Sequence, residues 1–153
     1  MLKWADDDTP FATGCTRYHN VMPTPSDETP KIMLWVNLGN GIRRRAMVDT
    51  GAPYLVLSPE IADLLDKDLS NECGHATLKI RGEPYQGRLV RHGMTLLAEE
   101  GEGCTIETTA FVPAPEAIAT WGDTPIVLGF YCCLDRLRFA IDPDSMRFFF
   151  GVP

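Results

Sequence analysis

The sequence lacks the features that would point to a membrane or nucleic-acid partner. No apolar run among its 153 residues approaches the ~20 needed to span a bilayer. The net charge is -7, which argues against a domain built to hold phosphate backbones; the run Arg43-Arg44-Arg45 reads better as a solvated strand face or edge. The first residues lack the basic start and apolar stretch of a secretory signal. We therefore expect no membrane partner, no nucleic-acid partner and a cytoplasmic location.

Neither a disulfide framework nor a metal site is visible in the sequence. The five cysteines are odd in number, and the neighbours Cys132 and Cys133 cannot easily bridge to each other. Reduced thiols are the simplest account. The best metal-ligand spacing is Cys73-Gly74-His75, and one short pair without a second pair is a weak signal. We expect no metal and no cofactor.

The chain divides into an N-terminal arm and one domain. Residues 1–30 are rich in Asp, Thr and Pro and hold no period of 2 or 3.6, which predicts an extended, partly mobile arm. Order is expected from Lys31, so the domain spans 31–153. Its length is sufficient for a hydrophobic core.

Within the domain, the pattern predicts many short strands and little helix. The pair Asn40-Gly41 favours a tight hairpin turn, and Ser58-Pro59-Glu60 is a helix-start signal. The expected strands are 31–38, 42–48, 76–81, 87–97, 104–113, 126–128, 138–142 and 146–151; the expected helices are 59–66 and 130–137, and 113–125 is expected to be a loop. The fold class is therefore all-β with minor helix, as a closed or sandwiched sheet.

Three motifs carry chemical information. Met47-Val48 leads into Asp49-Thr50-Gly51-Ala52 at the end of a predicted strand. An apolar triplet closed by glycine, Ile126-Val127-Leu128-Gly129, precedes a predicted short helix. Between them lies a predicted hairpin, Ile80 to Arg88, whose Gly82 and Gly87 permit the backbone freedom of a lid.

These motifs, in this order over residues 31–151, resemble the retropepsin-like aspartic proteases. The closing segment Leu137–Pro143 and the final FFFG are similar to bacterial members of that family. The resemblance implies an acid-protease half-barrel that forms a two-fold homodimer and cuts peptide or protein substrates. It also implies roles for individual residues: Asp49 as the catalytic carboxylate, Thr50, Gly51 and Ala52 as the active-site loop, Ile126, Val127, Leu128 and Gly129 as the strand beside that loop, and Gly82, Tyr85 and Gly87 as flap and substrate-binding residues.

The chemistry requires a second carboxylate. Two carboxylates about 3 Å apart cannot both be ionised, so they share a proton; one acts as base on a water while the other donates to the substrate carbonyl. Asp49 is the one Asp followed by Thr-Gly; Asp123-Thr124, for example, continues into proline. The dyad must therefore combine two chains, and a homodimer supplies it. The resemblance implies that the Thr50 hydroxyl holds the two loops together.

Two positions depart from viral members of the family. Pro53 and Phe130 stand where an acid and an arginine pair near the dimer interface, so that ion pair is absent. Residues 148–150 and the N-terminal arm are the expected replacements in the dimer contact. Pro53 also lacks the backbone N–H that grips substrate, and we expect the Tyr54 N–H to serve instead.

Two other functions remain open from the sequence. The first is a non-catalytic retropepsin-fold dimerisation or peptide-binding module, which Pro53 favours. The second is a small-molecule-binding β barrel in which Asp-Thr-Gly is incidental. Tyr85 likewise has two interpretations, a flap residue over the substrate or an exposed hairpin-tip tyrosine.

Overall fold

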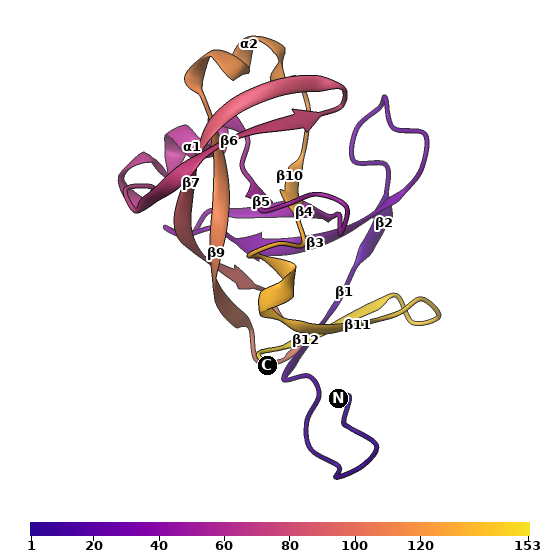
Figure 1. The fold of residues 1–153 in the computed structure, drawn as a ribbon. Helices are drawn as coiled ribbons and strands as arrows, with labels where there is room; N and C mark the ends of the chain where they lie inside the picture. Colours follow the sequence, from indigo (N-terminus) through magenta and orange to yellow (C-terminus); the bar gives the residue numbers. More distant parts are fainter.

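A computed structural model describes all residues, 1–153, and is dominated by strands. The predicted class, mostly β with little helix, is confirmed. Figure 1 shows a curved sheet with short helices at one end and a second, smaller sheet at the other. No helix is both long enough and apolar enough to cross a membrane.

The larger sheet closes on itself. Its strand order is β2 (His19–Val21), β3 (Lys31–Asn37), β4 (Arg43–Val48), β10 (Ile126–Leu128), β5 (Leu55–Val56), β9 (Cys104–Pro113), β7 (Glu83–Leu96) and β6 (Glu72–Ile80). A further pairing of β3 with β7, Val36 opposite Leu96, joins β3, β4, β10, β5, β9 and β7 into a ring. Closure removes most free strand edges of the larger sheet. Only β2 and β6 remain as edge strands, each paired with the ring on one side.

The smaller sheet unites the two ends of the chain. Its order is β11 (Arg138–Asp142), β12 (Arg147–Gly151), β1 (Gly14–Arg17) and β8 (Glu100–Gly101). Phe148 and Phe150 are fully buried in the chain's own core. The expectation that residues 148–150 serve as the dimer contact is therefore wrong for these two rings, since they already pack inside one subunit.

The N-terminal arm is more ordered than the sequence suggested. Residues 14–17 pair with β12, Gly14 opposite Phe150, and residues 19–21 pair with β3. Cys15 and Tyr18 are buried. Order therefore begins well before Lys31. The pairing of residues 14–17 with β12 joins segments 130 or more residues apart, so no local period could indicate it.

Turns and helices follow the local signals in part. Asn40 and Gly41 both have positive φ, 49° and 73°, and the Ile42 N–H donates to the Gly39 carbonyl at 2.8 Å, as expected for the predicted turn. Helix α1 (Pro59–Leu64) begins as predicted, and the Ile61 N–H donates to the Ser58 hydroxyl at 3.3 Å. A 3₁₀ turn, Asp66–Asp68, follows it.

One loop prediction and one helix prediction are wrong. The expected loop 113–125 contains a 3₁₀ turn, Pro115–Ala117, and helix α2 (Ile118–Trp121), because Trp121 is buried there against Tyr85. The expected helix 130–137 shrinks to a 3₁₀ turn, Leu134–Arg136. Cys132 has a φ of 54°, which interrupts right-handed helix.

The interior consists of two apolar clusters. The larger contains 25 buried residues and fills the ring of strands and the space toward the smaller sheet. The smaller contains Val56, Tyr85, Phe111, Ala117, Trp121 and Val127. Met47, Ala52, Leu78 and Ile80 pack against this second cluster, so it supports the region around the Asp49 motif.

Candidate active site

Asp49 lies on a loop fixed by backbone hydrogen bonds. The loop connects β4 to β5. The Asp49 N–H donates to the Leu128 carbonyl at 3.0 Å, and the Ala52 N–H donates to the Asp49 carbonyl at 3.1 Å. The Gly51 N–H donates to the carboxylate oxygen Oδ1 of Asp49 at 2.9 Å. The half-buried carboxylate is thus held at one oxygen by its own loop.

Strand β10 runs between the two strands that carry this loop. It is parallel to β4, with Val127 opposite Met47, and antiparallel to β5, with Leu128 opposite Leu55. Figure 1 shows β10 passing beside β4 and β5. Ile126, Val127 and Leu128 are all buried. The structure therefore brings together two of the three motifs found in the sequence.

Gly129 fastens the end of β10 to the Asp49 loop. Its N–H donates to the Tyr54 carbonyl at 2.8 Å, and the next residue, Phe130, donates to the Ala52 carbonyl at 2.8 Å. A Cβ atom on Gly129 would lie 2.3 Å from the Tyr54 carbonyl oxygen. The absence of a side chain at Gly129 is needed for packing against residues 53–54.

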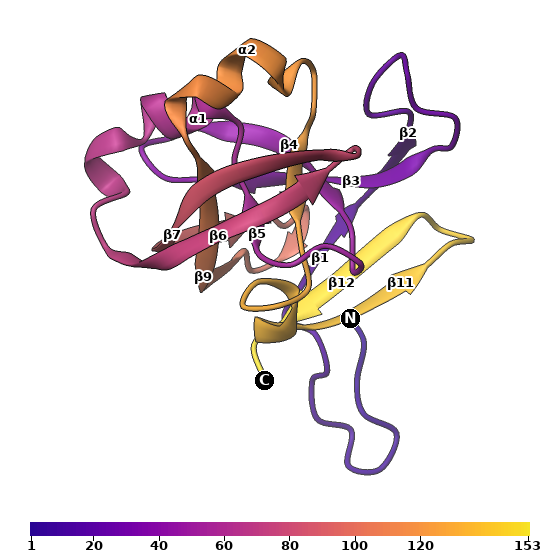
Figure 2. The same cartoon turned by 45° about the horizontal axis from the view of Figure 1, so that its top comes forward.

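A cavity of about 260 Å³ opens beside Asp49. The hairpin of β6 and β7, here called the flap hairpin, contributes one wall through residues 78–81 and crosses in front of β4 and β5 in Figure 2. Asp49 is the one acidic residue of the cavity. Its apolar wall comprises Met47, Ala52, Val56, Leu78, Ile80 and Val127. The alternation of apolar Ala76, Leu78 and Ile80 with polar Thr77 and Lys79 is the signal that could have identified the flap residues.

Of the two glycines expected to give the flap its backbone freedom, Gly82 lies at the hairpin turn and Gly87 does not. The turn is only Arg81-Gly82, with φ of 51° and 89°, so Gly82 lies at the tip. Gly87 is buried within β7, where a Cβ would lie 2.4 Å from the Val112 carbonyl oxygen. It is a close-packing glycine and not a tip glycine.

Tyr85 neither lines the Asp49 cavity nor stands exposed at a tip. Its side chain is 8% exposed, and its ring lies 4.9 Å from that of Trp121. Its hydroxyl donates to the Thr120 carbonyl at 3.0 Å. Both interpretations of Tyr85 drawn from the sequence are corrected: the residue anchors the flap hairpin to α2.

The expected use of the Tyr54 N–H for substrate is also wrong. Tyr54 has a φ of 58°, and its N–H donates to the Tyr131 carbonyl at 3.1 Å. That donor is therefore already occupied, while Pro53 has none. Neither residue 53 nor residue 54 therefore has a free backbone N–H to offer to a peptide.

Exposed aromatic rings flank the Asp49 loop. Phe130 is 46% exposed and Tyr131 is 59% exposed, although both follow a fully buried strand. Tyr54 and Tyr131 pack edge to face with ring centres 5.8 Å apart. Tyr54, Phe130 and Tyr131 are called the aromatic surface below. In the sequence Phe130 stands out only as a missing arginine, because no local pattern marks these three rings as neighbours.

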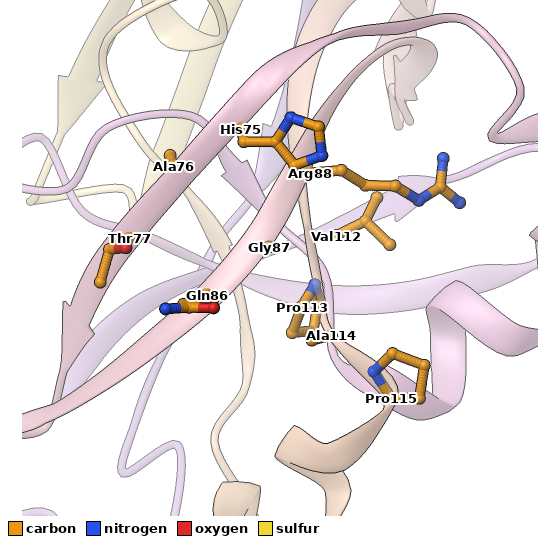
Figure 3. A pocket seen from close by; sticks show the side chains of 10 residues that line it. All are labelled: His75, Ala76, Thr77, Gln86, Gly87, Arg88, Val112, Pro113, Ala114 and Pro115. Atoms are coloured by element: carbon orange, nitrogen blue, oxygen red, sulfur yellow. The ribbon is translucent and has the colours of Figure 1, made fainter.

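The largest cavity, about 540 Å³, lies elsewhere and carries no acid. Figure 3 shows its walls, which include His75, Arg88 and Val112. His75 lies 3.3 Å from the Glu72 carboxylate, and the Arg88 guanidinium donates to the Leu69 carbonyl. Arg88 is thus partnered within the chain, and His75 lies beside an acidic side chain. Although it is larger than the cavity beside Asp49, this cavity has no carboxylate in its walls that could activate a water.

No group of three or more His, Cys, Asp or Glu side chains is close enough to hold a metal ion. The five cysteines are free.

No model of a known protein family matches the chain, and a search of curated proteins finds no match. The chemical interpretation therefore depends on the geometry around Asp49.

Proposed function

We propose that the protein is a retropepsin-like aspartic endopeptidase that acts as a homodimer with one Asp49 from each subunit. The observation that carries the proposal is the setting of Asp49. Its half-buried carboxylate is held by the Gly51 N–H on a loop fastened to β10, beside a cavity walled by a β-hairpin. A carboxylate held in place beside an apolar, hairpin-walled cavity can act on a water next to a bound peptide once a second carboxylate joins it.

The reaction follows from two carboxylates that share one proton. The ionised Asp49 takes a proton from a water, and the resulting hydroxide attacks the peptide carbonyl carbon. The protonated Asp49 of the other subunit donates to the carbonyl oxygen, which gives a tetrahedral intermediate. The Asp49 that took the water's proton then passes it to the amide nitrogen, the other Asp49 takes a proton back from a hydroxyl of the intermediate, and the C–N bond breaks to give a carboxylic acid and an amine.

The need for a partner is supported by what the cavity lacks. Asp49 is its one acid, so a single subunit cannot supply the dyad. The aromatic surface beside the loop would be buried when two such loops approach, and it supplies apolar contact where an ion pair is missing. The Thr50 side chain is exposed on the same loop, free to reach the partner's loop.

The cavity favours an extended peptide with apolar side chains. Met47, Val56, Leu78, Ile80 and Val127 line it. Strand β6 is at the edge of its sheet, so its outer side can receive a peptide as an added strand. Cytoplasmic residence is part of the proposal and agrees with five unpaired thiols, three of them buried.

A cleavage assay tests the proposal. The protein is incubated with a peptide library between pH 4 and pH 7, beside an Asp49→Asn variant and with an active-site-directed aspartic-protease inhibitor. We expect cleavage by the parent alone, blocked by the inhibitor. Cleavage that persists in Asp49→Asn would contradict the assignment of Asp49.

One observation favours a second function, a dimeric peptide-binding module without turnover. Pro53 has no N–H, and the Tyr54 N–H is bound to Tyr131, so the loop holds a peptide main chain less firmly. A library peptide that binds the dimer and is never cut, in the parent and in Asp49→Asn alike, would support this alternative.

A further inference from the structure

The tip of the flap hairpin is held by one arginine. Arg81 Nη2 lies 3.1 Å from Asp27 Oδ2 and 3.3 Å from the Thr24 hydroxyl oxygen, and Nη1 lies 3.4 Å from Asp123 Oδ1. In Figures 1 and 2 the tip points toward the loop between β2 and β3, which carries Asp27. Three segments distant in sequence thus meet at a single guanidinium.

The acceptor for Arg81 is organised without it. Thr24 is 4% exposed, and its N–H and hydroxyl donate to Asp27 Oδ2 at 2.9 and 2.7 Å. The Asp27 N–H donates back to the Thr24 carbonyl at 3.2 Å. The Thr24 hydroxyl and the nearby charge of Arg81 lower the pKa of Asp27, with a smaller contribution from Lys31. The Thr24 hydrogen bonds therefore hold the Asp27 carboxylate in place independently of the arginine.

Arg81 lies where an ion pair would restrain the flap hairpin most, at its turn and beside the Asp49 cavity. It is a turn residue with φ of 51°, next to Gly82, and it also belongs to the wall of the Asp49 cavity. Behind the turn, Tyr85 on β7 is fixed separately by its contacts with Thr120 and Trp121. Releasing Arg81 would free the turn while leaving the Tyr85 contacts with α2 in place.

We propose that Arg81 is a positioning residue that latches the flap hairpin over the Asp49 cavity, fastened by Asp27 on one side and Asp123 on the other. The gating role of the latch rests on the proposed protease function, whereas the latch itself does not. Exposed ion pairs are individually weak, so the latch opens often enough to admit a peptide. The loop 22–30, assigned from the sequence to a mobile arm, is then part of the gate.

Hydrogen exchange of the full-length protein, read by mass spectrometry, tests the latch. Arg81→Ala and Asp27→Asn are expected to raise exchange of residues 76–84 about fivefold or more, while the rest of the chain is unchanged. Asp123→Asn is expected to have a smaller effect because its contact is longer and more exposed. Arg81→Lys is expected to restore part of the protection.

Arg91→Ala is the matched control. Arg91 lies on the same hairpin strand β7 and forms an exposed ion pair with Glu107 at 3.1 Å, far from the tip. We expect no change at residues 76–84 in this variant. Equal exchange in Arg81→Ala, Asp27→Asn and Arg91→Ala would overturn the latch.

The outcome is separable from that of the protease proposal. Exchange needs no turnover, so an inactive protein with a loosened tip in Arg81→Ala supports the latch alone. An active enzyme whose tip exchange is unaffected retains the protease and loses the latch. If Arg81→Ala raises exchange throughout the chain, the Asp27→Asn variant becomes the test, since it leaves the hairpin sequence unchanged. A rise confined to residues 76–84 in Asp27→Asn then supports the latch, and no rise there overturns it.

Discussion

Gly129 and Tyr54 lie so close that no side chain fits between them. The Gly129 N–H donates to the Tyr54 carbonyl at 2.8 Å, and a Cβ on Gly129 would lie 2.3 Å from that oxygen and 2.4 Å from the Pro53 carbonyl oxygen. This contact ties the strand β10 to the loop of Asp49. The position of the carboxylate therefore depends on a residue eighty positions away.

Gly129→Ala should displace the Asp49 loop. We expect a loss of about 1–3 kcal/mol in the free energy of unfolding, because backbone must move to admit the methyl group. Any peptide cleavage should fall sharply as well. Chemical denaturation measures the first effect and the peptide assay the second.

Gly93→Ala is the control for this substitution. A Cβ on Gly93 meets nothing within 4 Å, and its φ is not in the left-handed region. Its stability and activity should match those of the parent. An equal loss in both alanine variants would show that the contact with Tyr54 has no special importance.

The aromatic surface predicts how the dimer is held. Phe130→Glu and Tyr131→Glu should weaken self-association by tenfold or more, because a charge would be buried in an apolar contact. Sedimentation velocity over a concentration series measures this. Ile118→Glu is the control, since Ile118 is 67% exposed on α2 and lies outside the Asp49 cavity. A dimer unaffected by either aromatic substitution would place the interface elsewhere.

The Asp27 carboxylate predicts a dependence of stability on pH. Its pKa lies below the ordinary 3.8, chiefly because the Thr24 hydroxyl donates to it and Arg81 is near. A lowered pKa in the folded state stabilises the protein above 3.8, and this contribution is lost as the pH falls through the lowered value. The charged groups near Asp27 are Arg81 and Lys31, and Asp123 contacts Arg81 through its other guanidinium nitrogen.

Thermal unfolding of Asp27→Asn tests this dependence. Its midpoint should lie below that of the parent at pH 7, and the difference should shrink steadily below pH 3.8. A difference that stays constant to pH 2 would mean that the Asp27 charge contributes nothing.

The cysteines should differ widely in reactivity. Burial raises the pKa of the Cys133 thiol to about 12, with further contributions from Asp135 and Cys132, and burial also raises the pKa of Cys104. Cys73 is exposed. Iodoacetamide at pH 8 should label Cys73 first and leave Cys133 unmodified until the protein unfolds. Peptide mass spectrometry identifies the order, and early labelling of Cys133 would contradict the buried position.

Local signals in the sequence predicted much of the fold. Strand β10 at 126–128, the Asn40-Gly41 turn and the Ser58 cap each depend on a few neighbouring residues, and each agrees with the structure. The burial of Tyr85 could not be predicted, because it depends on Trp121 from a segment read as loop. Pairing of β1 with β12 is likewise a long-range event without a local period.

The same distinction holds for the candidate site. Asp49 and the strand beside it carry recognisable residue types, so the sequence could place both. The contacts of Arg81 with Asp27 and Asp123, 54 and 42 positions away, depend on where two loops end in space. Charged residues in polar loops are common, and nothing in their spacing marks these three as partners.

Mixing the parent with Asp49→Asn tests the central claim most directly. At a fixed amount of parent, added variant should form mixed dimers that hold one carboxylate and cannot complete the proton exchange. Peptide cleavage should therefore fall toward zero as the variant exceeds the parent, after time for subunits to exchange. Cleavage that stays constant at a large excess of Asp49→Asn, while mixed dimers are present, would contradict a dyad shared between two chains.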